Sequence, residues 1–223
     1  MKKIEIFVRH CYYSQNSEII GRNRPKWFDK EAVFANLKKT TNPNIANINV
    51  IFDNHFGPCN YDGPQTFINC GTEAKSFLAM LDIIMSKNLP DDTIIYLLED
   101  DYLHREGWCH VMLEAFTLPD VKYVTLYDHK DKYMHYPELI SKIFATESTH
   151  WRTTPSTTNT YACKMETLRN EIDKHREFSI GRDVTDDNSK FLHLGNLVSS
   201  IPGWATHCDD YMSPTIDWER LVK

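Results

Sequence analysis

The sequence has no long hydrophobic run and few of the residues that mark fibrous or disordered chains. Its 223 residues include 8 Gly and 10 Pro, too few for a collagen-like chain or a flexible linker. No stretch approaches the roughly 18 apolar residues that a membrane span needs. The first residues, Met1–Ile6, contain an acid where a secretory signal would be apolar. These absences predict a cytoplasmic chain without a membrane span.

The sequence also lacks the cysteine spacing of a structural zinc site or a disulfide framework. None of its 6 cysteines forms a C-x-x-C pair, and they are scattered along a chain long enough to form a core without crosslinks. We therefore expect free thiols at Cys11, Cys59, Cys70, Cys109, Cys163 and Cys208.

There is no excess of positive charge either. The 25 Lys and Arg are outnumbered by 31 Asp and Glu, for a formal net charge of −6, which argues against a nucleic-acid partner. What the chain does contain is 41% hydrophobic and 12% aromatic residues, enough to build a core. The composition predicts a single folded domain over residues 1–223.

Hydrophobic patterns along the chain alternate between the spacing of strands and that of helices. Strands are expected at residues 3–8, 50–52, 93–98, 121–126 and around 161–162, and helices at 27–39, 71–85, 108–115, 165–172 and 184–194. Residues 54–69 and 146–160 are expected to be loops, and the chain end an irregular tail. This order predicts an α/β fold with a mostly parallel sheet flanked by helices. Residues 1–127 are typical of a nucleotide-binding part, and residues 128–223 form a more irregular second part.

The most informative residues are Glu99, Asp100 and Asp101, which directly follow the apolar strand TIIYLL. Ligands of open α/β sheets bind beyond the carboxyl ends of the strands. In an extended backbone, Glu99 and Asp101 point to the same side, so both carboxylates can meet one divalent cation. A solvated acidic loop is the simpler alternative, and phosphatases, nucleases and glycosyltransferases all use such clusters.

The order of several short motifs resembles that of glycosyltransferases with the GT-A fold. Leu97–Asp101 is similar to their D-x-D motif, which binds a nucleotide-sugar through Mn²⁺ or Mg²⁺. The other similar segments are Ile6–Arg9, Val50–Asp53, Gly71–Leu81, Tyr127–Tyr133 and Trp151–Thr160. A closer resemblance is to the rhamnosyltransferase-like N-terminal domain of a chlorovirus glycosyltransferase. The resemblance implies viral glycan synthesis, with UDP-rhamnose or UDP-glucose as donor and an oligosaccharide or glycoprotein as acceptor.

The resemblance also implies roles for single residues. Asp101 would be a metal ligand, Glu99 would help to hold the ion or the ribose, and Asp100 would face the nucleotide. The sequence departs from D-x-D in having Glu first. His207 is placed in the chain where the family often supplies a further metal ligand; a hydrogen-bonded surface histidine is the alternative.

Further donor contacts are expected at the ends of the first two strands and on the following helix. Val8 and Arg9 end the first strand, and Asp53 ends the second. The Arg9 guanidinium can pair with phosphate or with the acidic cluster itself. Lys75 lies one turn into the helix after Gly71, and it either reaches a phosphate or belongs to the solvated face of that helix.

Sugar transfer with inversion needs a base that removes the proton of the acceptor hydroxyl from the side opposite the leaving diphosphate. Asp183 resembles the acid of the family at the start of a helix that lines the acceptor site, and it is our candidate base. Asp186 and Asp187 follow within a turn and compete for this role, and helix capping would also explain acids here.

The sequence predicts a metal-dependent, inverting glycosyltransferase, and two other classes stay open. One is a metal-dependent phosphohydrolase or nuclease, with Asp128 or Asp131 completing a two-metal site. The other is a non-catalytic module that binds a nucleotide or a carbohydrate. Trp151, Trp204 and Tyr211 either stack on sugars or belong to the core.

Overall fold

The computed structural model describes residues 3–12, 23–54, 61 and 63–222. The chain divides into two compact units, each assembled from separate segments. Unit 1 comprises Met1–Tyr13, Pro43–Asp100 and Pro155–Gly195, and unit 2 comprises Ser14–Asn42, Asp101–Thr154 and Asn196–Lys223. The boundary therefore falls inside the acidic cluster, between Asp100 and Asp101. The functional division at residue 127 stays a prediction.

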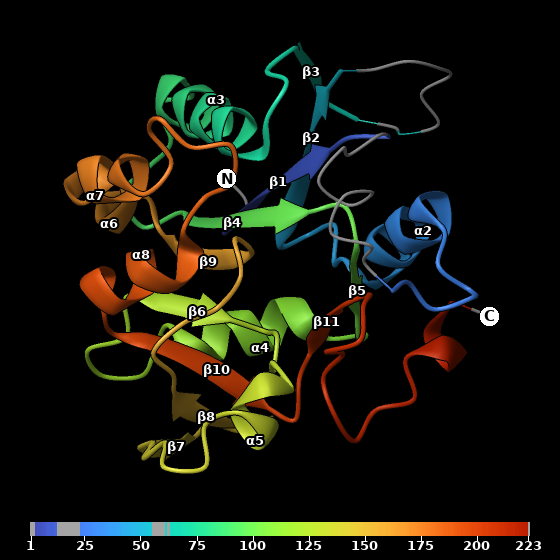
Figure 1. Ribbon diagram of the computed structural model, residues 1–223, viewed down its shortest axis with the longest axis vertical. Coiled ribbons are helices and arrows are strands. Elements are labelled where there is room, and N and C mark those ends of the chain that lie inside the picture. The colour runs from blue at the N-terminus through green and yellow to red at the C-terminus, as the bar shows by residue number, and fades with distance from the viewer. Residues whose placement is uncertain (1–2, 13–22, 55–60, 62, 223) are drawn as a thin grey trace. The chain divides into compact units, whose positions relative to one another are not determined.

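Unit 1 contains a sheet with strand order β3-β2-β1-β4-β9 (Figure 1). The pairs β1–β2, β1–β4 and β2–β3 are parallel, and β9 runs antiparallel to β4. Its strands are β1 (Ile4–His10), β2 (Ala46–Asp53), β3 (Gln65–Ile68), β4 (Ile94–Glu99) and β9 (Tyr161–Lys164). Its helices are α3 (Glu73–Ser86), α6 (Met165–Asn170), α7 (Ile172–Glu177) and α8 (Asp187–Leu194).

The strands and helices of unit 1 follow from their sequences. All seven residues of β1 are buried, as expected of a strand between parallel neighbours that is covered on both faces. Helix α3 begins where Thr72 accepts a hydrogen bond from the backbone N–H of Lys75, a local N-cap contact typical of threonine. Its residues Phe77 and Leu81 are fully buried, as their helical spacing predicts.

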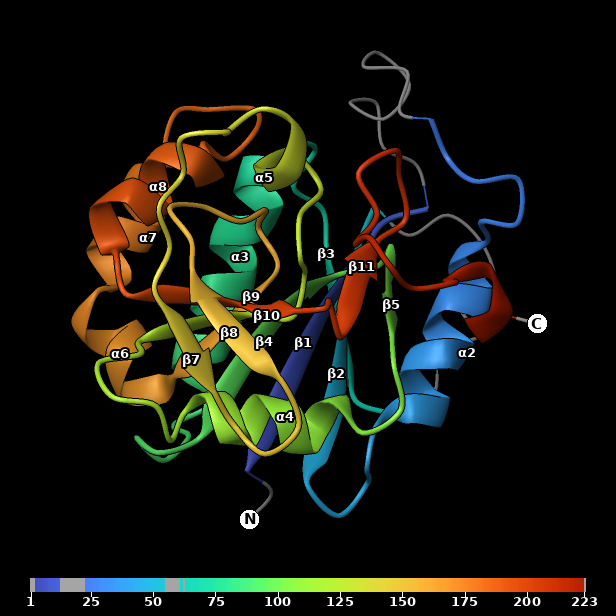
Figure 2. The same ribbon diagram turned by 90° about the horizontal axis from the view of Figure 1, so that it is seen from below.

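Unit 2 contains the strand order β6-β10-β8-β7 and the antiparallel pair β11–β5. Strands β6 and β10 are parallel, whereas β8 is antiparallel to both β10 and β7. Figure 2 shows β7 beside β8. The strands are β5 (Tyr102–His104), β6 (Tyr123–Thr125), β7 (Ile143–Ala145), β8 (His150–Thr153), β10 (Leu197–Ile201) and β11 (Ala205–His207). The helices are α2 (Lys30–Thr40), α4 (Trp108–Ala115), α5 (Asp131–Met134) and the 3₁₀ turn η1 (Glu219–Leu221).

The chain end forms a small core in unit 2. Val33 of α2 packs with Leu103, Cys208 and Trp218, so the predicted irregular tail is tied to β5 and α2 by apolar contacts. The indole N–H of Trp218 donates to the carbonyl of Ser213 at 2.8 Å, which satisfies its only polar atom.

The observed elements confirm the predicted α/β class with a mixed, mostly parallel sheet flanked by helices. Several boundaries were wrong. β3 lies in the predicted loop 54–69, β8 lies in the predicted loop 146–160, and β10 and β11 occupy the predicted tail. The helix predicted over 165–172 is two short helices, α6 and α7. β8 was missed because polar residues dominate it, and only the fold shows that the charge of Arg152 is paired.

Five cysteines are free thiols, as predicted: Cys11, Cys70, Cys109, Cys163 and Cys208. Cys59 lies outside the described residues. None of the described helices combines the length and the apolar character that a bilayer crossing requires.

A buried histidine in unit 1 makes the stability of the fold sensitive to acid. His175 is fully buried, with its Nδ1 2.7 Å from the hydroxyl oxygen of Tyr161. Burial, aided by the charge of Lys190, lowers the pKa of His175 to about 3. The unfolded chain takes up this proton near pH 6.5, so stability declines as the pH falls from about 6.5 towards 3.

We predict that His175→Gln removes this part of the pH dependence, because Gln does not titrate. The free energy of unfolding of the wild type, minus that of the variant, should fall by up to about 1.4 kcal/mol per pH unit below pH 6.5. Urea denaturation between pH 4 and 8 measures it, with the exposed His193→Gln as the matched control. A constant difference across this range would contradict the buried, neutral state of His175.

Candidate functional site

One candidate cluster lies in unit 1, where β1 and β4 end side by side. Arg9 is paired in register with Glu99 on the neighbouring strand. Its Nη2 donates to Glu99 Oε1 at 2.9 Å and to Glu73 Oε1 at 2.6 Å, while Nη1 donates to the Glu73 carbonyl at 2.7 Å. The predicted pairing of Arg9 with the acidic cluster is what the structure shows.

Glu73 is the centre of this network. Besides Arg9, its carboxylate accepts hydrogen bonds from Asn159 Nδ2 at 2.9 Å and from the backbone N–H of Thr185 at 2.7 Å. Burial alone would raise the pKa of Glu73, but the charge of Arg9 and these hydrogen bonds outweigh it and lower the pKa to about 2. Glu73 therefore ties the segment that leads into α8 to the end of β1.

Asp100 has a different set of partners in unit 1. Its Oδ2 lies 2.7 Å from His10 Nδ1 and accepts the backbone N–H of Cys11 at 3.1 Å. The hydroxyl of Tyr61 lies 3.0 Å from the same His10 nitrogen. Asp100, which we expected to face a nucleotide, thus holds the last residues of β1.

The other residues predicted to contact the donor are Val8, Asp53 and Lys75. The Val8 side chain is in the core and is 1% exposed. Asp53 is buried, and its Oδ1 accepts the backbone N–H of Cys70 at 2.8 Å. Lys75 is exposed on α3. The structure describes these positions without testing a role in donor binding.

The acids before and within α8 differ in their surroundings. Asp183 is exposed, and its carbonyl accepts the N–H of Ala74 at 3.1 Å. Asp186 caps α8 by accepting the N–H of Ser189 at 3.1 Å. Asp187 is half-buried, and burial raises the pKa of its carboxyl although the charge of Lys190 opposes this. Asp187 therefore combines partial shielding from water with a raised pKa.

Lys190, three residues beyond Asp187, is a cation that the sequence analysis missed. It is fully buried, donates to Asn159 Oδ1, and lies over the ring of Phe77 with Nζ 4.4 Å from the centroid. Burial lowers the pKa of Lys190 to about 8, against the raising effect of Asp187 and Glu73. The spacing of Asp187 and Lys190 was the available signal, since residues three apart share a helix face.

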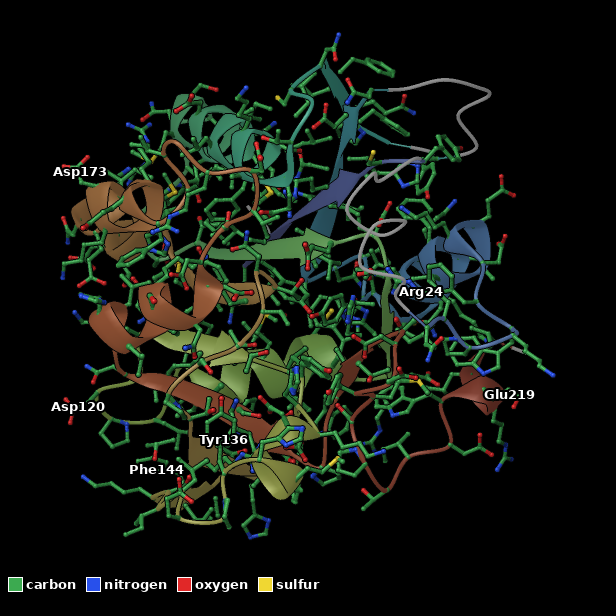
Figure 3. All side chains as sticks on the ribbon, in the orientation of Figure 1. Arg24, Asp120, Tyr136, Phe144, Asp173 and Glu219 are labelled. Carbon is green, nitrogen blue, oxygen red and sulfur yellow. The ribbon has the colours of Figure 1, made fainter. Side chains whose placement is uncertain are left out.

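A second candidate cluster lies in unit 2 and unites two predicted metal ligands. Asp101 and His207 are 106 residues apart in the sequence, yet Asp101 Oδ2 is 2.8 Å from His207 Nε2. The other ring nitrogen, Nδ1, is 2.6 Å from Asp209 Oδ2. Arg24, which precedes α2 (Figure 3), donates from Nη2 to Asp101 Oδ2 at 2.6 Å.

The charges in this second cluster stabilise one another. Burial would raise the pKa of Asp101, but the charges of His207 and Arg24 hold it well below its usual range. Burial would lower the pKa of His207, but Asp101 and Asp209 raise it to about 9. Asp209 could have been noticed as the acid two residues after His207, whereas nothing in the sequence singled out Arg24.

No family model matches the sequence, and no curated protein matches it. Among solved structures, residues 1–349 of TarS from S. aureus superimpose with a TM-score of 0.51 at 13% identity, covering 92% of this chain and 60% of that one. The chain therefore spans less than two thirds of that structure. The 2-C-methyl-D-erythritol 4-phosphate cytidylyltransferase (IspD) of Francisella tularensis gives a TM-score of 0.49 at 13% identity, covering 89% of this chain and 91% of that one.

The chain has a GT-A-like α/β fold. At 13% identity the likeness to TarS establishes the fold alone. In this GT-A-like fold, the acids at the end of β4 continue a central strand of the unit 1 sheet, where ligands of open α/β sheets bind.

We predict that Glu73→Gln destabilises the protein by on the order of 2 kcal/mol, because it leaves the buried guanidinium of Arg9 with one carboxylate instead of two. Glu31→Gln is the matched control, since Glu31 is also an acid in the first turn of a helix but is exposed. Chemical denaturation at pH 7 measures both variants. Equal losses would mean that Glu73 only matches the helix dipole.

The effect of Glu73→Gln should also depend on pH. The pKa of Glu73 is lower in the folded state than its usual 4.5, so its stabilising effect is complete above about pH 4.5 and is lost as the pH falls towards 2. The difference between wild type and variant should shrink over this range in acid denaturation. A difference that stays constant would contradict the charged pair with Arg9.

Proposed function

We propose that this chain is a metal-dependent, inverting glycosyltransferase that takes its sugar from a nucleoside diphosphate. A UDP-linked donor is the preferred candidate, with UDP-rhamnose or UDP-glucose as examples, and the acceptor is an oligosaccharide or a glycoprotein. The observation that carries the proposal is the meeting of Asp101 and His207 in a chain with a GT-A-like fold. These two residues were singled out as ion ligands from the sequence alone.

The ion would be Mn²⁺ or Mg²⁺, and the Asp101 carboxylate suits it. His207, whose pKa is raised to about 9, would have to release the Nε2 proton to bind the ion. Within the described residues, no group of three or more His, Cys, Asp or Glu side chains could hold a metal. Asp101 and His207 would therefore act as two protein ligands, and phosphates and water would complete the shell, as is usual for Mg²⁺. When bound, the ion supplies positive charge that stabilises the departing diphosphate.

The surrounding residues would support that pair. Asp209 at Nδ1 of His207 orients the ring so that Nε2 faces Asp101, the arrangement in which a carboxylate positions a metal-ligating histidine. Arg24 brings a guanidinium to the same Asp101 oxygen. This cation is available to a phosphate oxygen of the donor in place of Asp101.

Asp187 meets the physical requirements of a general base better than Asp183, which the sequence resemblance singles out. A base must be shielded from water and must have a pKa nearer neutrality than a free carboxylate. Asp187 is half-buried with a raised pKa, whereas Asp183 is exposed. In the proposed step, Asp187 takes the proton of the acceptor hydroxyl while the oxygen forms the new bond to the sugar carbon and the diphosphate leaves with inversion.

The alternative of a two-metal phosphohydrolase or nuclease finds less support. A two-metal site needs more shared carboxylates than one ion does, and the described residues hold no group of three or more His, Cys, Asp or Glu side chains suited to a metal. Asp128 pairs with Arg152 and Tyr133, and Asp131 pairs with Lys132 and His129. A non-catalytic binding module differs from a transferase only in lacking turnover. Incubation with Mn²⁺ and a panel of nucleotide-sugars separates the three: release of nucleoside diphosphate, release of inorganic phosphate, or binding without product.

We predict that Asp101→Asn weakens Mn²⁺-dependent donor binding by at least about tenfold, because a neutral amide is a poor ligand for a hard cation. Calorimetry with UDP-glucose, with and without Mn²⁺, measures the change. Asp210→Asn, an exposed acid in the same unit, is the matched control and should bind as the wild type does. An unchanged Mn²⁺-dependent affinity for the donor in Asp101→Asn would mean that Asp101 is not a ligand of the ion.

We predict that Asp187→Asn lowers turnover by about 100-fold or more and leaves the donor dissociation constant unchanged, because the base acts only on the acceptor. Asp183→Asn is the matched comparison and should retain turnover. Rates of nucleoside diphosphate release in the presence of acceptor measure both. Loss of turnover in Asp183→Asn but not in Asp187→Asn would show that Asp183 is the general base.

A further inference from the structure

Unit 2 contains a pocket of about 490 Å³ that neither candidate cluster occupies. This volume is within the range of about 300–1,000 Å³ that is typical of small-molecule sites. Its walls are mainly apolar, with one carboxylate among them. The residues that form most of its lining are Asp128, Tyr133, Met134, Ile201, Pro202 and Pro214.

Tyr133 provides this pocket with an aromatic ring that is exposed and yet held in place. The side chain is 54% exposed. Its hydroxyl donates to Asp128 Oδ2 at 2.7 Å, and the guanidinium carbon of Arg152 lies 5.0 Å from the ring centroid. Exposed tyrosines are usually free to change rotamer, so these two contacts remove an entropic cost that a ligand stacking on the ring would otherwise bear.

The polar groups behind the ring are matched in charge and buried. Arg152 Nη2 donates to Asp128 Oδ1 at 2.8 Å, and both residues are at least nine-tenths buried. Because Arg152 neutralises Asp128, the pocket suits an uncharged ligand. Lys130 also lines the pocket and is itself exposed, so its ammonium is available to donate hydrogen bonds to ligand oxygens.

Backbone strain occurs at the same pocket. Thr215, which also lines it, has a φ of 72°. Among the described residues, the other non-glycine residues with positive φ are all Asn or Asp, which tolerate this region, whereas a β-branched side chain does not. Strain of this kind persists where the surrounding structure enforces it, and it concentrates at functional sites.

We propose that this pocket binds one sugar ring. The C–H face of a pyranose matches the ring of Tyr133 and the aliphatic walls, and its hydroxyls match the exposed Lys130 ammonium. A purely aliphatic ligand would leave this ammonium unused. A flat nucleobase is favoured less, because the walls beyond Tyr133 are aliphatic side chains and proline rings rather than a second aromatic plane.

This inference deepens the proposed function, because it assigns the pocket to a sugar of the acceptor. The assignment to the acceptor rests on the proposed function, whereas the binding of a sugar does not. The two are separable by experiment, since binding is measured without a donor or a metal and turnover is measured with both.

Saturation-transfer difference NMR on the wild-type chain tests the pocket, with the methyl glycosides of glucose, galactose, mannose and rhamnose as probes. We expect signal from at least one glycoside. Tyr133→Ala should weaken its binding by at least about tenfold, and Tyr133→Phe, which keeps the ring but not the hydroxyl contact with Asp128, should weaken it less. Circular dichroism checks that each variant is folded.

The matched control is Tyr136→Ala. Tyr136 (Figure 3) is also an exposed tyrosine close to α5, but it does not line the pocket. The Tyr136→Ala variant should bind the glycoside as the wild type does. The proposal is overturned if no glycoside gives a signal, if Tyr136→Ala weakens binding as much as Tyr133→Ala, or if uridine binds in a Tyr133-dependent way and the glycosides do not. Glycoside binding without any donor turnover would support the proposal that the pocket binds a sugar and would contradict the proposal that the chain is a glycosyltransferase.

Discussion

The pairing of Arg9 with Glu73 and Glu99 is the constraint on which unit 1 depends. A buried strand that ends in acids is unstable unless positive charge meets them, because carboxylates taken out of water repel one another. Arg9 supplies that charge from the neighbouring strand, in register with Glu99. Glu73 then brings the network to the first turn of α3. The carboxyl end of the sheet is stable because one guanidinium is shared by two carboxylates.

The same network is hydrogen-bonded to the segment that carries the candidate base. The same Glu73 carboxylate accepts the backbone N–H of Thr185, two residues before Asp187. Asn159 bonds to Glu73 through its amide and accepts from Lys190 through its oxygen. The proposed base is thus placed by a buried set of charges that also anchors β1 and β4, so its position depends on Glu73 and Asn159.

Unit 2 also contains buried carboxylates that are each shared by two hydrogen-bonding partners. There Asp101 is shared by a histidine and an arginine, and Asp128 is shared by Arg152 and Tyr133. In the first case, the shared carboxylate is the proposed ion ligand. In the second, it fixes an exposed aromatic ring beside a pocket. Both arrangements keep a charge inside the protein by surrounding it with hydrogen-bond donors.

The sequence by itself determined the α/β class, the cap of α3 at Thr72 and the burial of β1 and β4, because hydrophobic spacing and capping are local properties. It also singled out Asp101 and His207, through the chain order that resembles a known family. Only the tertiary structure decided that Arg9 meets two glutamates, that Asp187 is shielded while Asp183 is exposed, and that Tyr133 lies fixed beside a pocket. These depend on contacts between residues tens of positions apart, and no local pattern records which distant side chain will neutralise a given charge.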